Sequence, residues 1–309
     1  MMNFDTQHKS IQTTDTVLMV VPAAFGYNEE TAVNNSFQSR TFGGDIAETA
    51  IKETEAYIRL LKENGITVLV AYDTPEPRTP DAVFPNNWFS THEDGILVMY
   101  PMFAENRRLE RKQWPLEEIT ANFDISRMVD LRPYEEKGMF LEGTGSLVLD
   151  RVNRIAYACK SPRTNMTVLD DFCSQLGYTP CVFEAYDEVG LQIYHTNVMM
   201  NVGTRIAVVC MDSIRDPGQR ELVRETLEKT GKVIMEITPD QMNHFAGNML
   251  ELHNRCGKPC LVMSQTAYNS LTDGQIRMLE THMKLITPDI PCIEQIGGGS
   301  ARCMLAEIF

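Results

Sequence analysis

The chain has 309 residues, of which 43% are hydrophobic and 23% charged, a balance typical of a globular protein with a large core. Its 42 acidic residues outnumber the 28 basic ones and give a net charge of -14. Such a charge repels nucleic acid and anionic membrane surfaces, so neither is expected as a partner.

The first 25 residues carry one apolar stretch, which is too short to span a bilayer, and no basic start or small-residue cleavage site accompanies it. We therefore expect a cytoplasmic protein. All eight cysteines lie in the second half of the chain without a framework of close spacings. In a reducing compartment this pattern predicts thiols and not disulfides.

Amphipathic helical patterns recur along the chain, with starts roughly 50 to 60 residues apart. In the first pattern, Ile51, Tyr57, Ile58 and Leu61 form an apolar face, and Gly65 ends it. The five predicted helices cover residues 47–65, 107–122, 165–177, 218–231 and 273–284. Their regular recurrence indicates a repeated structural unit.

Short β-rich runs lie between these helices, and several of them are predicted to form hairpins. They cover residues 66–73, 95–101, 146–159, 180–186, 197–210 and 232–237. Each unit therefore predicts a hairpin, a helix and a strand. Repetition of this kind favours a closed ring or array over a doubly wound sheet, with functional groups around a central hole. No linker or low-complexity stretch divides the chain, so we expect one domain over residues 1–309.

Several polar residues stand out at the predicted strand ends and turns. They are Asp81, Asn86, Asn87, Arg107, Glu142, Arg163, His195 and Asn197. His195 and Asn197 occupy alternate positions of a predicted strand and would share one face. Each residue alone also has an ordinary explanation as a turn former, a cap, a core histidine or a surface ion pair.

Near the C-terminus, the stretch "GGGSARCML" places Cys303 behind three glycines. Glycines in a row indicate a backbone path that excludes a Cβ, or a close approach of the backbone to another group. The ordinary alternative is a turn that leads into a last strand, with Cys303 packed as a small apolar residue. The whole set of polar residues, taken with this cysteine, is more than packing explains.

The segments "VFPNNW", "NRRLE", "FLEG", "SPRTN", "HTN" and "GGGSARC", in this order, resemble the guanidino-group-modifying superfamily. This superfamily includes arginine deiminases, dimethylarginine hydrolases and glycine amidinotransferases, and the resemblance is strongest to the citrulline-utilisation hydrolases. It covers nearly the whole chain. It implies a five-bladed, pseudo-symmetric α/β propeller, or pentein, of ββαβ-type units around a central channel.

The same resemblance implies roles for individual residues. Cys303 would be the nucleophile, His195 the general acid and base, and Glu142 a carboxylate that binds a substrate nitrogen. Arg107 and Arg163 would clamp the α-carboxylate of an amino-acid substrate, for which a forked guanidinium is suited. The chemistry needs neither a metal nor an organic cofactor.

Two departures from the superfamily pattern bear on the substrate. Asn87 stands where deiminases and dimethylarginine hydrolases carry aspartate, and Asn197 stands where deiminases carry aspartate. An amide both donates and accepts hydrogen bonds, whereas a carboxylate only accepts. A ureido group has a carbonyl oxygen that a guanidinium lacks. We therefore predict hydrolysis of citrulline to ornithine, ammonia and carbon dioxide through a thioester, with Asp81 and Asn86 as further substrate contacts.

Three other interpretations remain open at this point, as does the oligomeric state. One is a deiminase, hydrolase or amidinotransferase that acts on arginine or another guanidino compound. Another is a non-catalytic binding protein on the same fold. The last is a zinc-stabilised interaction module, with loosely spaced candidate ligands at His244, His253, Cys256 and Cys260. An ordinary hairpin, with Gly257 and Pro259 in its turn, also explains this last segment.

Overall fold

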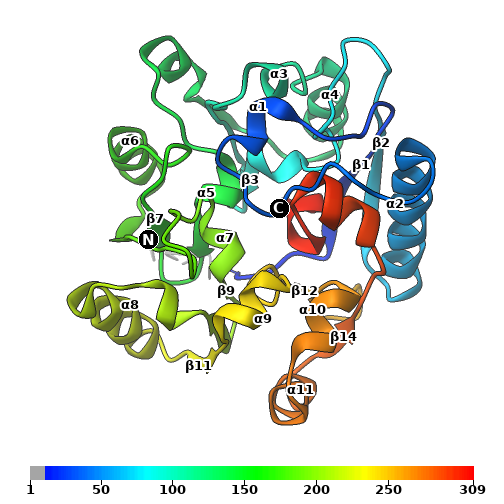
Figure 1. Cartoon of the computed structure of the whole chain (residues 1–309). Helices are drawn as coiled ribbons and strands as arrows, with labels where there is room; N and C mark the ends of the chain where they lie inside the picture. Colours follow the sequence, from blue (N-terminus) through cyan, green and yellow to red (C-terminus); the bar gives the residue numbers. More distant parts are fainter. Residues whose placement is uncertain (1–10) are drawn as a thin grey trace, which may run out of the picture.

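Over residues 11–309, five three-stranded sheets repeat one connection pattern around a ring (Figure 1). In each sheet the central strand pairs antiparallel with one neighbour and parallel with the other. The sheets are β15–β1–β2 (Ala306–Ile308, Thr16–Val21, Thr67–Tyr72), β3–β4–β5 (Phe89–His92, Ile96–Met99, Arg127–Asp130), β6–β7–β8 (Val148–Asp150, Ile155–Cys159, Thr179–Phe183), β9–β10–β11 (Met200–Val202, Ile206–Val209, Val233–Glu236) and β12–β13–β14 (Leu250–His253, Pro259–Val262, Lys284–Ile286). The predicted five-bladed α/β propeller is confirmed.

The computed structural model describes residues 11–309, apart from the side chains of residues 113–116 and 118. Residues 1–10, on which the expected lack of a targeting signal partly rests, lie outside the described residues. Within the described part of the chain, no helix is long and apolar enough to cross a membrane.

Helical crossovers join the parallel strands, as parallel pairing requires, and the longer ones form the outer layer of the ring (Figure 1). They are α2 (Ile46–Glu63), α3 (Glu105–Arg108), α4 (Gln113–Asn122), α6 (Met166–Leu176), α8 (Pro217–Lys229), α10 (Gln265–Ser270) and α11 (Asp273–Glu280). Helix α2 begins where the Asp45 side chain accepts the Glu48 N–H. It buries Tyr57, Ile58 and Leu61 and ends before Gly65, whose φ is +81°.

The prediction of one continuous helix over residues 107–122 is wrong. Helix α3 ends at Arg108, and α4 begins at Gln113. Pro115 has no N–H and is tolerated in the first turn of a helix but not in its interior. It therefore falls in the first turn of a new helix.

The two ends of the described chain close the ring. Strand β15 pairs antiparallel with β1, so that Ile308 lies opposite Thr16 and Ala306 opposite Leu18. The few residues that follow Cys303 therefore complete the first sheet. Cys303 itself lies just before this strand, in the 3₁₀ turn η5 (Ala301–Met304), and not on the strand.

Short helical turns precede the first strand of each sheet on the inner side of the ring. They are η1 (Pro85–Asn87), α5 (Gly143–Ser146), α7 (Thr196–Met199), α9 (Pro239–Asn243) and η5. Turn α5 contacts both η1 and α7, and η1 contacts η5. Residues that were far apart in the sequence thus meet near the axis of the ring.

Turn α7 corrects the prediction that His195 and Asn197 share one face of a strand. His195 is the extended residue before the turn, and Asn197 lies inside it. The turn is held across units, because Thr196 Oγ1 donates to Ser146 O at 2.6 Å and accepts the Cys159 N–H at 2.8 Å. The two side chains therefore face different parts of the channel.

Candidate active site

Four of the predicted site residues come from similar positions in successive units. Asn87 ends η1, Glu142 precedes α5, His195 precedes α7, and Cys303 lies in η5. Glu142 follows Asn87 by 55 residues, and His195 follows Glu142 by 53. The repeat therefore brings one polar side chain from each of these units to the inner side of the ring.

Glu142 and His195 form a buried pair. Glu142 Oε2 lies 2.7 Å from His195 Nε2, and Arg163 Nη1 lies 3.4 Å from the same oxygen. The other oxygen, Oε1, accepts the Phe103 N–H at 2.9 Å. Burial alone would raise the pKa of Glu142, but Arg163 and His195 outweigh it and hold that pKa well below its usual range. The ionised carboxylate therefore orients the imidazole through Nε2.

His195 is neutral at neutral pH. Burial lowers its pKa to about 4, although the hydrogen bond to Glu142 opposes this shift. Because Nε2 donates to the carboxylate, Nδ1 is the nitrogen that accepts. A Cβ on Gly145 would lie 2.7 Å from Nδ1. Glycine at this position therefore leaves room for the ring.

Cys303 lies beside two amides. It is buried, and its Sγ lies 3.2 Å from Asn248 Nδ2 and 3.6 Å from Asn197 Nδ2. Asn248 was missed in the sequence analysis. The signal that would have found it is the repeat itself, because Asn248 lies 53 residues after His195 and 55 residues before Cys303.

Arg107 holds the amide of Asn87 in one orientation. Its Nη1 donates to Asn87 Oδ1 at 2.6 Å. Asn87 Nδ2 is buried and has no hydrogen-bond partner among the described residues. Asn87 lines the cavity that Cys303 also lines, and its Nδ2 lies beside Gly145, as His195 Nδ1 does.

The guanidinium of Arg107 has protein partners on most of its N–H groups. It forms two hydrogen bonds of 2.9 Å with Glu110 and one of 3.0 Å with Phe84 O. Glu110 is a second residue that the sequence analysis missed, although it lies three residues after Arg107 in the same segment. These contacts make Arg107 a holder of Asn87, and its predicted role as a carboxylate clamp stays a prediction.

Arg163 lines the same cavity. Its Nε donates to Asn34 Oδ1 at 2.8 Å and its Nη2 to Thr31 O at 2.8 Å. The guanidinium carbon lies 4.8 Å from the centre of the Tyr194 ring. Nη1 contacts Glu142 at 3.4 Å, a longer distance than those made by Nε and Nη2. It is therefore the nitrogen of Arg163 best placed to bind a ligand.

Asp81 brings an acceptor to the cavity wall. Its Oδ2 accepts from Asn28 Nδ2 at 2.8 Å and from Thr31 Oγ1 at 3.0 Å. Its Oδ1 is buried without a hydrogen-bond partner among the described residues. The cavity encloses about 270 Å³, part of it open to solvent, and is lined by Thr31, Asn35, Asp81, Phe84, Asn87, Arg107, Arg163, Tyr194, His195, Cys303 and the glycines at 297–299.

The three glycines form one wall of this cavity. A Cβ on Gly297 or Gly299 would lie 2.8 Å from the Phe84 ring, and Gly298 has a φ of +64°. The Tyr194 hydroxyl donates to Gly298 O at 2.8 Å. The glycines therefore allow the close backbone approach that their spacing predicted.

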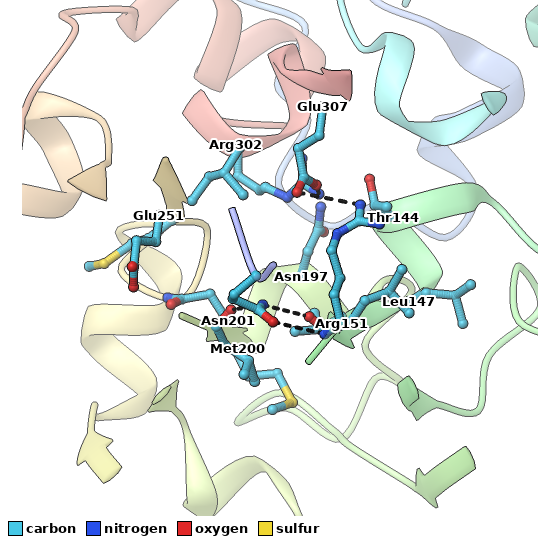
Figure 2. Close-up of a pocket in the computed structure, with 15 residues that line it drawn as sticks. Thr144, Leu147, Arg151, Asn197, Met200, Asn201, Glu251, Arg302 and Glu307 are labelled. Carbon is cyan, nitrogen blue, oxygen red and sulfur yellow. Dashed lines mark hydrogen bonds and ion pairs between the residues drawn. The ribbon is translucent and has the colours of Figure 1, made fainter. Parts of the chain in front are cut away.

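Two predicted substrate contacts lie away from this lining. Asn86 is buried, and its Nδ2 donates to Thr144 Oγ1 at 3.3 Å. Asn197 contacts Cys303 Sγ, but it lines a second cavity, shown in Figure 2, whose lining does not include Cys303. Its place inside turn α7, and not on a strand beside His195, is the reason for this difference.

We call this second cavity the rear chamber. Figure 2 shows the charged side chains around it, and its lining includes Arg151, Asn197, Glu251, Arg302 and Glu307. Glu307 Oε2 accepts from Arg302 Nη2 at 2.8 Å, and Oε1 lies 3.4 Å from Arg151 Nη2. Burial would raise the pKa of Glu307, but the two arginines lower it. The pair with Arg151 thus holds β15 against the sheet that contains β6, and the pair with Arg302 holds β15 to its own turn η5.

The candidate zinc ligands do not form a cluster. His253 and Cys260 lie in the β12–β13 hairpin, where His253 Nδ1 lies 2.9 Å from Thr13 Oγ1, whereas Cys256 is exposed in the turn. Among the described residues, no three histidine, cysteine or acidic side chains come together as a metal site would require. The hairpin interpretation of this segment is confirmed.

A family model described as eukaryotic N,N dimethylarginine dimethylhydrolase matches residues 21–309. The chain belongs to this family, and hence it is a carbon–nitrogen hydrolase of the guanidino-group-modifying superfamily. A comparison with curated proteins found no match.

Solved structures share the fold at low sequence identity. The arginine dihydrolase ArgZ from the ornithine–ammonia cycle in cyanobacteria has a TM-score of 0.72 at 15% identity; the match covers 95% of this chain and 40% of ArgZ. Its N-terminal domain, solved with bound substrate, has a TM-score of 0.71 at 15% identity, with 95% of this chain and 97% of that domain covered. DDAH from Pseudomonas aeruginosa, a cysteine-to-serine mutant complexed with citrulline, has a TM-score of 0.66 at 16% identity, with 96% and 100% covered.

Proposed function

We propose that this hydrolase acts on the ureido group of citrulline and releases ornithine, ammonia and carbon dioxide. The observation that carries the proposal is the orientation of the Asn87 amide. Arg107 occupies its oxygen, so the amide of a cavity-lining residue is left with a buried Nδ2 that has no hydrogen-bond partner among the described residues.

A hydrogen-bond donor at this point discriminates between the two substrate classes. A guanidinium presents only N–H groups and a positive charge, and it would meet the Asn87 N–H groups without an acceptor. A ureido group is neutral and presents a carbonyl oxygen, which the same N–H groups can bind. Mismatched buried polar groups are costly, so the Asn87 amide favours the ureido group.

Other residues of the cavity fit the amino-acid end of the substrate. The partnerless Oδ1 of Asp81 is suited to an α-ammonium group, and Arg163 Nη1 is suited to an α-carboxylate. We assign Arg107 to the orientation of Asn87, since its donors are already bound.

We retain the prediction that one catalytic domain spans residues 1–309.

The reaction then proceeds in two stages. The thiol of Cys303 gives its proton to His195 Nδ1 by way of a water molecule, and the sulfur attacks the ureido carbon while the Asn87 N–H groups bind the oxyanion. His195 returns the proton to the leaving nitrogen, and a thioester remains. Water, deprotonated by His195, releases the enzyme, and the resulting carbamate divides into an amine and carbon dioxide. One citrulline and one water thus give ornithine, ammonia and carbon dioxide.

Action on arginine or a methylated arginine is the second candidate. It is favoured by the description of the matching family, and by the carboxylates of Asp81 and Glu142 at the site. In this alternative the Asn87 amide would be tolerated without a partner on the substrate.

The test compares turnover of citrulline, arginine and dimethylarginine with product identification, for the parent and for Asn87→Asp. We expect the parent to prefer citrulline. Asn87→Asp should lower citrulline turnover about 100-fold through loss of the oxyanion donor, and it should improve binding of arginine. Cys303→Ala should be inactive on every compound.

Asn86→Asp is the matched control, because it adds the same charge one residue away, at a buried side chain that bonds Thr144. A general effect of buried charge would appear in both variants, whereas a change in the citrulline-to-arginine ratio should appear in Asn87→Asp alone. A parent that prefers arginine, or a ratio that stays constant in Asn87→Asp, would replace the proposal with the second candidate.

A further inference from the structure

We infer that Asn248 is a further catalytic residue, which binds the sulfur of Cys303 and favours its thiolate form. The inference rests on Cys303 being the nucleophile of the proposed function, but it does not depend on which substrate is used. Asn248 comes from the turn before β12, so the remaining unit of the ring also contributes to the site.

The amide of Asn248 has a single orientation that its contacts decide. Its Oδ1 accepts the Arg302 N–H at 3.0 Å, and its Nδ2 donates to Asn197 O at 3.0 Å. With the oxygen engaged by the main chain, the other N–H of Nδ2 points to Cys303 Sγ, 3.2 Å away. Asn248 is only 2% exposed, so water does not compete strongly for these contacts.

The backbone around Asn248 is shaped to bring it close to the sulfur. Phe245, at the start of this turn, has a φ of +63°, which is uncommon for a residue with a side chain. A Cβ on Gly247 would lie 2.3 Å from Val198 O in turn α7. The turn therefore packs against α7 more closely than another residue at 247 would allow, and strain of this kind is concentrated at functional sites.

The chemistry of the sulfur makes this contact significant. Among the described residues, the side chains within hydrogen-bonding distance of Sγ are the amides of Asn197 and Asn248. Asn248 Oδ1 can accept from the thiol at 3.7 Å, but its Nδ2 lies closer to the sulfur, at 3.2 Å. His195 is neutral at neutral pH. A hydrogen bond to an anion is stronger than one to a neutral thiol, and the thiolate is the reactive form of cysteine. The Asn248 N–H therefore shifts Cys303 toward its reactive form.

Alkylation of Cys303 by iodoacetamide measures this effect without any substrate. The rate is followed from pH 5 to pH 10, and modification is read at the Cys303 peptide by mass spectrometry, which separates it from the other cysteines. Asn248→Ala should slow alkylation at pH 7 roughly tenfold and move the midpoint of the pH profile upward. Asn248→Asp keeps the acceptor for the Arg302 N–H but sets a carboxylate against the sulfur, so its midpoint should move further upward.

Asn201→Ala is the matched control, because Asn201 Nδ2 donates to Gly247 O at 3.5 Å in the same turn. It should keep the parent's profile. An unchanged midpoint in the folded Asn248 variants, or an equal shift in the control, would overturn the inference. A parent that fails to convert citrulline while the alkylation midpoints move as expected would contradict the proposed function alone.

Discussion

Arg107 and Asn87 show how one buried side chain sets the chemistry of another. An isolated amide can turn either its oxygen or its nitrogen to a cavity. The 2.6 Å contact between Arg107 Nη1 and Asn87 Oδ1 removes this choice, and Glu110 holds the guanidinium in turn through two hydrogen bonds. The specificity that we propose therefore depends on three residues and not on Asn87 alone.

The lowered pKa of the single residue His195 leads us to predict that the stability of the protein depends on pH. Its pKa is lowered from 6.5 to about 4 by burial, against the opposing bond to Glu142. Between these values the unfolded chain binds a proton that the folded chain does not, so the free energy of unfolding should fall as the pH drops from about 6.5 to about 4. The loss should be up to about 3 kcal/mol.

Urea unfolding at several pH values in this window, for the parent and for His195→Gln, measures that loss. The variant lacks the titrating group and should lose less stability on acidification. His92 also has a lowered pKa through burial, but it is present in both proteins and cancels in the comparison. Parallel pH curves would show that His195 does not titrate as described.

At the scale of elements, the positions of the inner turns determine which side chains meet at the site. Each turn stands before the first strand of a sheet, and the turns contact one another near the axis of the ring. The glycine segment 297–299 lets η5 approach η1 at Phe84. The close approach of the glycine backbone to Phe84 therefore helps to bring Cys303 and Asn87 to one cavity.

Gly299→Ala should disturb this approach. The added Cβ would lie 2.8 Å from Phe84 Cε1, and overpacking of this kind costs about 1–3 kcal/mol. We expect a lower free energy of unfolding in urea together with lower turnover. Gly43→Ala is the control, since a Cβ there would meet nothing within 4 Å. Equal stability of the two variants would mean that the glycine wall tolerates side chains.

At the scale of the whole molecule, the ring depends on pairing between its first and last strands. Strand β15 is short and carries buried residues on both sides of Glu307, which is itself paired with Arg151 and Arg302. This pairing places the last unit beside the first and closes the cavity wall that holds Cys303.

Ile308→Ala should loosen this closure. Ile308 is 1% exposed and lies opposite Thr16 on β1, and truncation of such a side chain costs about 2–5 kcal/mol. Thermal unfolding should show a clearly lower midpoint. Val189→Ala, at a side chain that is 82% exposed, should change stability by less than about 0.5 kcal/mol. A similar midpoint for both variants would contradict the proposed importance of ring closure.

The sequence by itself determined the repeat, the order of hairpin, helix and strand, and most of the polar residues that line the cavity. Periodicity and turn chemistry belong to contiguous residues, which is why α2 and the β12–β13 hairpin were predicted correctly. The family resemblance supplied roles for Arg107 and Glu142, which the pattern of polar residues had already marked, but it did not supply their partners.

Only the tertiary structure decided which way the side chains face. Turn α7 forms because Thr196 bonds Ser146 and Cys159, in the preceding unit of the ring, and this turn sends Asn197 to the rear chamber while His195 meets Glu142. Asn248 likewise reaches Cys303 through bonds to Arg302 and Asn197. Such contacts join residues 37 to 54 positions apart. Each residue has many possible partners at such separations, so the order of amino acids along one segment does not specify which pair forms.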